Sequence, residues 1–301
     1  MPTATAVRAL IRLSRLKFLI GGFFSYALGA AVARFDGATI DWIAYVHGQL
    51  MVSAFHLMAH YLNDYYDRFC DAECERTPWS GGSGALLADG LSPSVALVAG
   101  MICAAIGVLC AIGFVVEGKP GPAVAGAAAG FLAWSYSAPP LRLLARGWGE
   151  LGTALIIAVL FPLAGYLTFA TEPARLLVST LPSFAAMLVL MFGVEFPDVE
   201  ADRRTGKLNL VARLGRARGR ILVYAAVGAI YAGTAIALAF GASPALAAFV
   251  LLTVPIAWGL CAQLARSDFS QPAVSADVAG RSVALLVSTI LGSMLAYLCV
   301  I

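Results

Sequence analysis

Long apolar stretches separated by short polar segments run through almost the whole chain. A transmembrane helix needs about 20 predominantly apolar residues to cross the hydrocarbon core of a bilayer. Stretches near that length predict nine transmembrane helices, at residues 18–34, 42–61, 93–116, 121–137, 150–170, 178–196, 220–240, 243–264 and 281–301. Gly and Pro mark the tightest predicted turns, at residues 117–120 and 241–244. The pattern predicts an all-α polytopic membrane protein, with residues 1–301 in one domain.

Composition and charge agree with this prediction and add an orientation. Hydrophobic residues make up 60% of the chain and charged residues 12%, whereas charged residues make up about 25% of a soluble domain. With the N-terminus inside, 17 of the 20 Lys and Arg residues fall on inner segments, and only Arg34, Lys119 and Arg175 fall outside. Basic residues concentrate on cytoplasmic loops. We therefore predict a multi-pass protein of the cell inner (plasma) membrane, with residues 1–16 as a basic cytoplasmic lead-in.

Two acidic clusters lie in polar segments on the predicted cytoplasmic side. Their members are Asp64, Asp67 and Asp71 in segment 62–92, and Asp198 and Asp202 in segment 197–219. Carboxylates are costly near hydrocarbon and are usually functional there. If helix continues through each segment, these spacings place the members of a cluster on one face. Grouped carboxylates suit Mg²⁺, which commonly also binds a substrate phosphate, so the clusters predict a Mg²⁺ site for a diphosphate.

The two clusters also suggest how the helices are arranged, because each cluster follows an even-numbered predicted helix. We expect two four-helix halves around a central cavity, with a ninth helix appended and the clusters facing each other. All long polar segments then lie on the cytoplasmic side, so we expect the active site to face the cytoplasm. Metal ions held there would stabilise the negative charge that builds on a leaving diphosphate.

Basic and aromatic side chains close to the clusters are further candidates. The cationic candidates are Arg68, Arg76, Arg142 and Lys207. They could neutralise a diphosphate, although cytoplasmic loops carry basic residues for reasons of topology as well. Tyr65 and Tyr136 could present their ring faces to a carbocation, or they could belong to an interfacial aromatic belt.

Other patterns near the first cluster indicate less. Cys70 and Cys74 are spaced as C-x₃-C, but no second ligand pair follows them, so a zinc site is not predicted. The Gly-rich run at 80–84 is either a phosphate-binding turn or a plain loop. It lacks the Lys-Ser/Thr of a nucleotide P-loop, and ATP use is not predicted. We expect His56 and His60 to line a substrate cavity or to bond a neighbouring helix.

Taken together and in order, these motifs resemble those of the UbiA-type superfamily of intramembrane prenyltransferases. The matching segments are Asn63-Asp64-x-x-Asp67-x-x-x-Asp71, residues 136–143, residues 147–151, Asp198-x-Glu200-x-Asp202, and residues 202–207. The Pro-Pro-Leu-Arg-Leu and Gly-x-Gly-Glu pieces most resemble the 1,4-dihydroxy-2-naphthoate polyprenyltransferases of menaquinone biosynthesis. In those enzymes a Thr-Leu pair usually follows the Gly-Lys pair, whereas residues 208–210 read Leu-Asn-Leu here.

The resemblance implies a site and a reaction. The implied ligands of two Mg²⁺ ions on a polyprenyl diphosphate are Asp64, Asp67, Asp71, Asp198 and Asp202. The expected catalytic residues are Asp64, Asp67, Asp198, Asp202, Arg142 and Tyr136. The expected substrate-binding residues are Asn63, Tyr65, Arg68, Arg76, Glu150 and Lys207. Ionisation leaves an allylic cation in a chamber that excludes water, and an electron-rich aromatic ring attacks this cation. Glu150 and Tyr136 are the candidate bases. The expected partners are a polyprenyl diphosphate, an aromatic acceptor and the lipid bilayer, with no nucleic acid.

Three alternatives stay open from the sequence. The acceptor could instead be a 4-hydroxybenzoate, homogentisate, chlorophyllide or glycerol-phosphate lipid. A UbiA-type terpene cyclase would use the same site, with the cation attacking its own double bonds. A transporter could also carry paired Asp clusters, but here the carboxylates lie at one membrane face, and the outer side offers few charged residues for a second gate.

Overall fold

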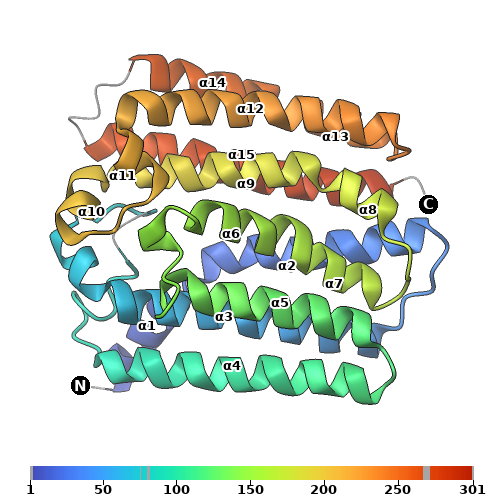
Figure 1. The fold of residues 1–301 in the computed structure, drawn as a ribbon, viewed down its shortest axis with the longest axis horizontal. Helices are drawn as coiled ribbons and strands as arrows, with labels where there is room; N and C mark the ends of the chain where they lie inside the picture. Colours follow the sequence, from blue (N-terminus) through green and yellow to red (C-terminus); the bar gives the residue numbers. More distant parts are fainter. Residues whose placement is uncertain (1–2, 75, 80–81, 267–271, 300–301) are drawn as a thin grey trace.

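The computed structural model describes residues 3–74, 76–79, 82–266 and 272–299. Within these residues all regular structure is helical (Figure 1). The longer elements are α2 (Leu16–Phe35), α3 (Trp42–Glu73), α4 (Pro93–Val116), α5 (Pro120–Ser137), α9 (Leu181–Glu195), α12 (Arg216–Ala239), α14 (Val254–Arg266) and α15 (Pro272–Leu298). The shorter ones are α1 (Thr3–Leu13), η1 (Leu144–Arg146), α6 (Gly149–Leu155), η2 (Ile156–Leu160), α7 (Phe161–Leu167), α8 (Ala174–Ser179), α10 (Val199–Thr205), α11 (Leu210–Leu214) and α13 (Ala245–Leu251).

The long helices lie side by side in one bundle (Figure 1). In the described part of the chain, seven helical stretches are long and apolar enough to cross a membrane: Leu16–Phe35, Pro93–Val116, Gly149–Leu167, Ala174–Glu195, Arg216–Ala239, Ala245–Arg266 and Ala273–Leu298. They correspond to seven of the nine predicted spans. α3 and α5 pack against each other in the same bundle, but they are not among these seven stretches. The spans at 42–61 and 121–137 therefore stay predictions.

Several of the predicted spans are interrupted near a proline. The span at 150–170 consists of α6, the π-helix η2 and α7, and Pro162 lies in the first turn of α7. Proline cannot donate a backbone hydrogen bond and disturbs the preceding turn, and a π-turn is one way in which a helix adjusts. Pro182 at the start of α9 and Pro255 at the start of α14 occupy similar positions after α8 and α13.

Both polar segments that carry the acidic clusters contain helix. In segment 62–92, α3 continues to Glu73 and carries the first acidic cluster on a helix. The segment 197–219 likewise contains α10 and α11. α15 packs against both α2 and α9. Its residues Val283, Leu286 and Val287 line an apolar space inside the bundle.

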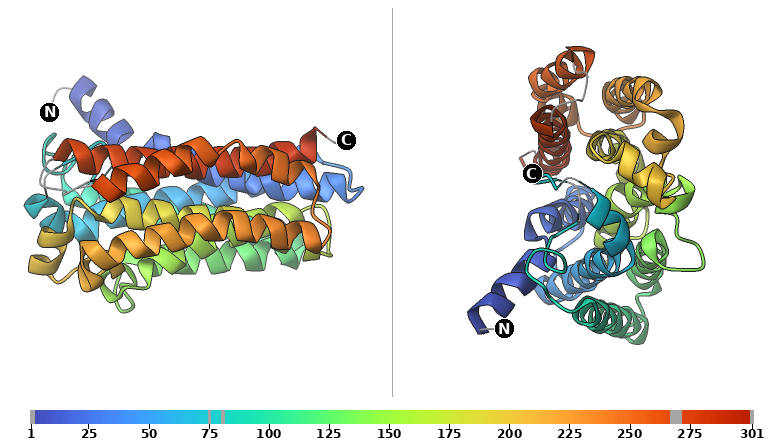
Figure 2. Two further views of the ribbon diagram at one scale, coloured as in Figure 1. Left: turned by 90° about the horizontal axis from the view of Figure 1, so that it is seen from above. Right: turned by 90° about the vertical axis from the view of Figure 1, so that its left-hand side faces the viewer.

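The two ends of the bundle differ in their chemistry. α10, α11 and the end of α3 lie at the same end as the N-terminus, and the C-terminus lies at the other (Figure 1). α1 stands outside the ring of long helices at the first end (Figure 2). At the far end Arg175 pairs with Asp36. Both acidic clusters therefore meet at one end, which we call the polar end.

Candidate active site at the polar end of the bundle

The first acidic cluster is formed by the last turns of α3. Asp64, Asp67 and Asp71 are all buried, with 3%, 8% and 8% of their surface exposed. Buried carboxylates are stable only with partners. Asn63 provides one, because its Nδ2 donates to Asp67 Oδ2 at 2.6 Å and also to Ser137 Oγ on α5 at 3.0 Å. The cluster is thus fixed to the neighbouring helix.

The second cluster lies where α9 ends and α10 begins. Asp198 precedes the first turn of α10, and Asp202 lies one turn later with 1% of its surface exposed. Asn209 donates from Nδ2 to Asp202 Oδ2 at 2.6 Å, and its own Oδ1 accepts from the backbone N–H of Ala212 at the start of α11. The cap of α11 therefore also positions the carboxylate of Asp202.

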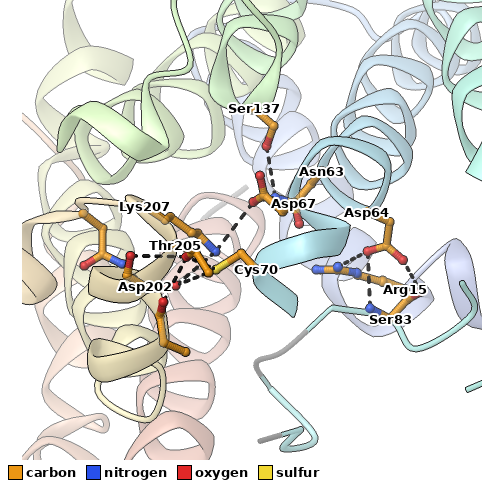
Figure 3. A network of polar contacts seen from close by, with 12 residues as sticks. Arg15, Asn63, Asp64, Asp67, Cys70, Ser83, Ser137, Asp202, Thr205 and Lys207 are labelled. Carbon is orange, nitrogen blue, oxygen red and sulfur yellow. Dashed lines mark hydrogen bonds and ion pairs between the residues drawn. The ribbon is translucent and has the colours of Figure 1, made fainter. Parts of the chain in front are cut away.

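Lys207 joins the two clusters (Figure 3). Its Nζ lies 3.6 Å from Asp67 Oδ2 and 3.7 Å from Asp202 Oδ1. Burial alone would lower the pKa of Lys207, but Asp67, Asp202 and Asp71 outweigh it and raise that pKa well above its ordinary value. Lys207 is therefore a fixed positive charge between carboxylates that come from opposite halves of the sequence.

The remaining carboxylate of the first cluster is strongly affected by its burial. Burial raises the pKa of Asp71 to about 7; Lys207 and Arg15 oppose the shift, and Asp67 and Asp64 add to it. Burial also raises the pKa of Asp202, against the effect of Lys207. A cation that binds between crowded carboxylates of this kind stabilises their negatively charged form.

Arg15 is a site residue that the sequence analysis counted only as a topology signal. Its guanidinium forms an ion pair with Asp64, which also accepts a hydrogen bond from the Ser83 hydroxyl (Figure 3). The backbone of Arg15 has φ 45° and ψ 48° at the break between α1 and α2. This left-handed conformation turns the side chain toward the cluster. No pattern in the sequence predicts this conformation.

We predict that Arg15→Gln tightens Mg²⁺ binding to the substrate-free protein by about tenfold. Asp64 must leave Arg15 before it can bind a metal, and the substitution also removes a nearby positive charge. Isothermal titration with Mg²⁺ measures the change. Arg12→Gln is the matched control, because Arg12 pairs with Asp89 at 2.9 Å outside the cluster. Equal affinities for wild type and Arg15→Gln would contradict the prediction.

Two adjoining chambers lie between the clusters and the bundle interior. The polar chamber, of about 100 Å³, is lined by Asp71, Asp198, Asp202, Lys207 and Glu195, among others. The apolar chamber, of about 210 Å³, lies among α2, α3, α5, η2, α9 and α15, and His56 and His60 are in its wall. Both chambers share the side chains of Arg15, Asn63, Trp79, Tyr136, Met191 and Val194. A molecule with a charged head and an apolar tail would fit across the boundary.

A third opening reaches the clusters from another side. It has a volume of about 180 Å³, and its wall includes Tyr66, Asp67, Tyr136, Arg142 and Lys207. Arg142 is exposed at its rim. Tyr136 therefore borders all three spaces, whereas Arg142 borders only this one.

The structure does not bring every candidate residue to these spaces. Tyr65 packs on the α1 side, against the small cluster that contains Ala9 and Leu13, so its ring does not face the apolar chamber. Arg68 lies over the ring of Tyr65, with its guanidinium carbon 4.8 Å from the ring centre. Arg76 donates to the Ser83 carbonyl oxygen at 2.7 Å and holds the loop after α3.

Two buried glutamates lie next to the polar chamber. Glu195 is part of its wall, and Glu150 lies beside Glu195 but is not among the residues that line the chamber. Glu150 is completely buried, and its Oε1 accepts from the backbone N–H of Leu210. The carboxyl group of Glu195 is buried against that of Glu150. Glu195, which lies one turn before Asp198 in the sequence, is therefore the glutamate that faces the chamber.

Of the Gly-rich run 80–84, residues 80 and 81 lie outside the described residues, but Gly82 lines the polar chamber. Gly82 has φ 73°, and a Cβ there would overlap Oδ2 of Asp71. We predict that Gly82→Ala lowers Mg²⁺-dependent activity at least about tenfold, because Asp71 must move.

Gly118→Ala is the control for this substitution. Gly118 also has φ 73°, but a Cβ there would meet nothing within 4 Å. It belongs to the turn between α4 and α5, which is at the far end of the bundle (Figure 1). The backbone strain of a left-handed alanine destabilises both variants by about 1–2 kcal/mol. The midpoint of thermal unfolding should therefore shift by a similar amount in each. Similar activities for the two variants would contradict a role for Gly82 in placing Asp71.

An apolar bundle of long helices, with buried carboxylates gathered at one end, is typical of an integral membrane protein. The sequence pattern of the UbiA prenyltransferase family matches residues 19–297. The chain belongs to this family, is a multi-pass integral membrane protein and is a prenyltransferase-family enzyme.

Solved structures show the same fold at low sequence identity. A UbiA homologue from Archaeoglobus fulgidus, bound to GPP and Mg²⁺, is 17% identical, with a TM-score of 0.65 over 94% of this chain and 99% of that chain. The apo structure of a homologue from Aeropyrum pernix K1 is 14% identical, with a TM-score of 0.67 over 93% and 97%. A structure of digeranylgeranylglyceryl phosphate synthase is 12% identical, with a TM-score of 0.64 over 98% and 99%. A comparison with curated proteins gave no match.

Proposed function

We propose that this enzyme transfers a polyprenyl group from an allylic diphosphate to an aromatic acceptor, with Mg²⁺, at the cytoplasmic face of the inner membrane. The observation that carries the proposal is the pair of buried acidic clusters facing each other around Lys207, directly beside an apolar chamber. Family membership supports the reaction class. The homologue from Archaeoglobus fulgidus, bound to GPP and Mg²⁺, supports the donor and the metal.

The residues at the polar end fit Mg²⁺. The donor set consists of buried carboxylates, which are the hard oxygen ligands that this ion prefers. The residues that would hold it are Asp64, Asp67, Asp71, Asp198 and Asp202. When bound, the metal supplies positive charge to the diphosphate as the C–O bond breaks.

The chain's own cations complete the binding of the diphosphate. Lys207 and Arg15 are paired with carboxylates of the clusters and lie in the wall of the polar chamber. A diphosphate in that chamber offers both groups new anionic partners while the carboxylates turn to the metal. Binding of substrate and metal would therefore exchange one set of ion pairs for another, so that no buried charge is left unpaired.

The apolar chamber is suited to the prenyl chain. Apolar side chains of α5, η2, α9 and α15 exclude water, which would otherwise quench an allylic cation. Tyr136 stands where the two chambers meet and could present its ring to that cation. We propose Tyr136 as the catalytic aromatic residue and leave Tyr65 outside that role.

The route through the third opening favours an acidic aromatic acceptor. Arg142 at its rim and Lys207 at its inner end are both cationic, and Tyr136 lies beside them. A ring carboxylate would be attracted along this path. We therefore propose 1,4-dihydroxy-2-naphthoate, the acceptor of menaquinone biosynthesis, with 4-hydroxybenzoate as the second candidate. Glu150 would act on the acceptor proton only through Glu195, since Glu195 faces the polar chamber.

The test is a reaction with the purified protein, Mg²⁺, farnesyl or geranylgeranyl diphosphate and a panel of aromatic acceptors, read by mass spectrometry. A prenylated and decarboxylated naphthoate supports the full proposal. A prenylated product of another acceptor keeps the reaction and replaces the acceptor. A cyclised hydrocarbon without an adduct would assign a terpene cyclase, and turnover that survives EDTA would overturn the metal-diphosphate assignment.

A further inference from the structure

Three potential metal ligands lie together beside the second acidic cluster. They are Cys70 and Cys74 at the end of α3 and Asp202 on α10, and their ligand atoms all lie within 4.8 Å of one another. Cys70 Sγ donates to Asp202 Oδ1 at 3.2 Å across 132 positions of sequence (Figure 3). The sequence shows only a C-x₃-C pair without a partner, and the fold supplies the third ligand.

We infer that Cys70, Cys74 and Asp202 form a binding site for a thiophilic divalent cation, of which Zn²⁺ is the type case. Thiolate sulfur selects Zn²⁺ over Mg²⁺. Zn–S bonds of about 2.3 Å in a tetrahedral arrangement separate two sulfur ligands by about 3.8 Å. Ligand atoms already within 4.8 Å reach that spacing with small side-chain movements.

Charge and burial at the site favour a cation. Cys70 and Asp202 are buried and Cys74 is half-buried, so three protein ligands are fixed while one side stays accessible. That side leaves a fourth position for a water molecule. Both thiols lose a proton when the metal binds, and the site then carries three negative charges against the two positive charges of the ion. Thr205 Oγ1 lies 3.0 Å from Cys70 Sγ and would support this ligand from outside the metal's own shell.

Asp202 is shared between this site and the proposed Mg²⁺ site. Its Oδ1 accepts from Cys70 and also pairs with Lys207. A thiophilic cation held by the cysteines would therefore draw Asp202 away from the diphosphate-binding cluster and inhibit prenyl transfer. Metal binding stands on the geometry alone, whereas the inhibition rests on the proposed function.

Metal binding is tested without any substrate. The purified full-length protein, reduced with a thiol-free reductant, is loaded with Zn²⁺ for metal analysis, and separately with Co²⁺ for absorption spectroscopy. We expect one Zn²⁺ per chain and a thiolate-to-Co²⁺ charge-transfer band. Cys70→Ala and Cys74→Ala should each weaken binding at least about tenfold and remove the band. Cys103→Ala, a half-buried cysteine of α4, should behave as wild type.

Two results would overturn the metal site: unchanged binding in both Cys70→Ala and Cys74→Ala, or Zn²⁺ binding with no thiolate band for Co²⁺. The half-buried Cys74 makes its variant informative even if Cys70→Ala lowers the yield of folded protein. Thermal unfolding without added metal verifies that the variants fold.

Inhibition is tested by adding Zn²⁺ to turnover reactions at saturating Mg²⁺. Wild type and Cys103→Ala should lose activity at the same Zn²⁺ concentration, whereas Cys74→Ala should need at least about tenfold more. Equal inhibition of Cys74→Ala would show that Zn²⁺ competes at the carboxylates and would overturn the inhibitory role. Failure of the proposed function appears differently, as no turnover even without Zn²⁺, and leaves the binding result intact.

Discussion

Replacing Asp202 by Asn should lower kcat/KM for prenyl transfer at least about 10³-fold, or about 4 kcal/mol of transition-state stabilisation. Asp202 is 1% exposed and is the carboxylate of the second cluster that pairs with Lys207. Asn has nearly the same shape and keeps an acceptor for Asn209, but it lacks the negative charge that a divalent cation requires. Turnover measured over a series of Mg²⁺ concentrations shows the loss.

Asp36→Asn is the matched control for this substitution. Asp36 also forms an ion pair, with Arg175 of α8, and α8 lies at the far end of the bundle (Figure 1). We expect it to keep wild-type kcat/KM, because it lies outside the acidic clusters. If Asp202→Asn retained a tenth of wild-type activity, a ligand role for this carboxylate would be untenable.

Lys207→Met should lower kcat/KM by about 10³-fold and should raise KM for the diphosphate. The substitution removes the cation that lies 3.6 Å from Asp67 and 3.7 Å from Asp202. It leaves buried carboxylates without their partner and deprives the diphosphate of a positive group. Breaking a buried ion pair from one side costs about 3–5 kcal/mol, so thermal stability should fall as well.

Lys207→Arg separates the two effects. It restores a positive charge between the clusters and should recover stability, but its planar guanidinium cannot copy the point charge of an ammonium group, so activity should recover only in part. Lys119→Met, in the turn between α4 and α5 and outside all three spaces, controls for the loss of a lysine. Full activity of a folded Lys207→Met protein would contradict the role of Lys207 in binding the diphosphate.

The helical bundle was predictable because membrane helices are read from continuous local sequence. Length and hydropathy predict Pro93–Val116 within a residue or two of its observed bounds, and they place Leu16–Phe35 and Arg216–Ala239 nearly as well. The Asp spacing on α3 was likewise predictable, because a helix that passes through Asn63 and Asp71 must place them on one face. Family membership, which the motifs suggested, is confirmed.

The side-chain directions at the site were less predictable. Tyr65 and Tyr136 are both tyrosines close to the acidic motifs, yet Tyr65 packs on the α1 side and Tyr136 borders the chambers. Glu150 belongs to a recognisable motif, but Glu195 is the glutamate that lines the polar chamber. Which face of a helix meets a cavity depends on its neighbours, and those neighbours come from distant parts of the chain.

By itself, the sequence determined the class of this protein: an all-α membrane enzyme of the UbiA family, with two acidic clusters separated along the chain. Hydropathy and short motifs are local properties of the chain, so they can be recognised without a structure. Only the tertiary structure decided that Lys207 stands between the clusters, that Arg15 pairs with Asp64, and that Asp202 meets Cys70. These contacts join segments that are far apart in sequence, and their energies depend on burial and on distances of a few ångströms, which only the packed bundle fixes.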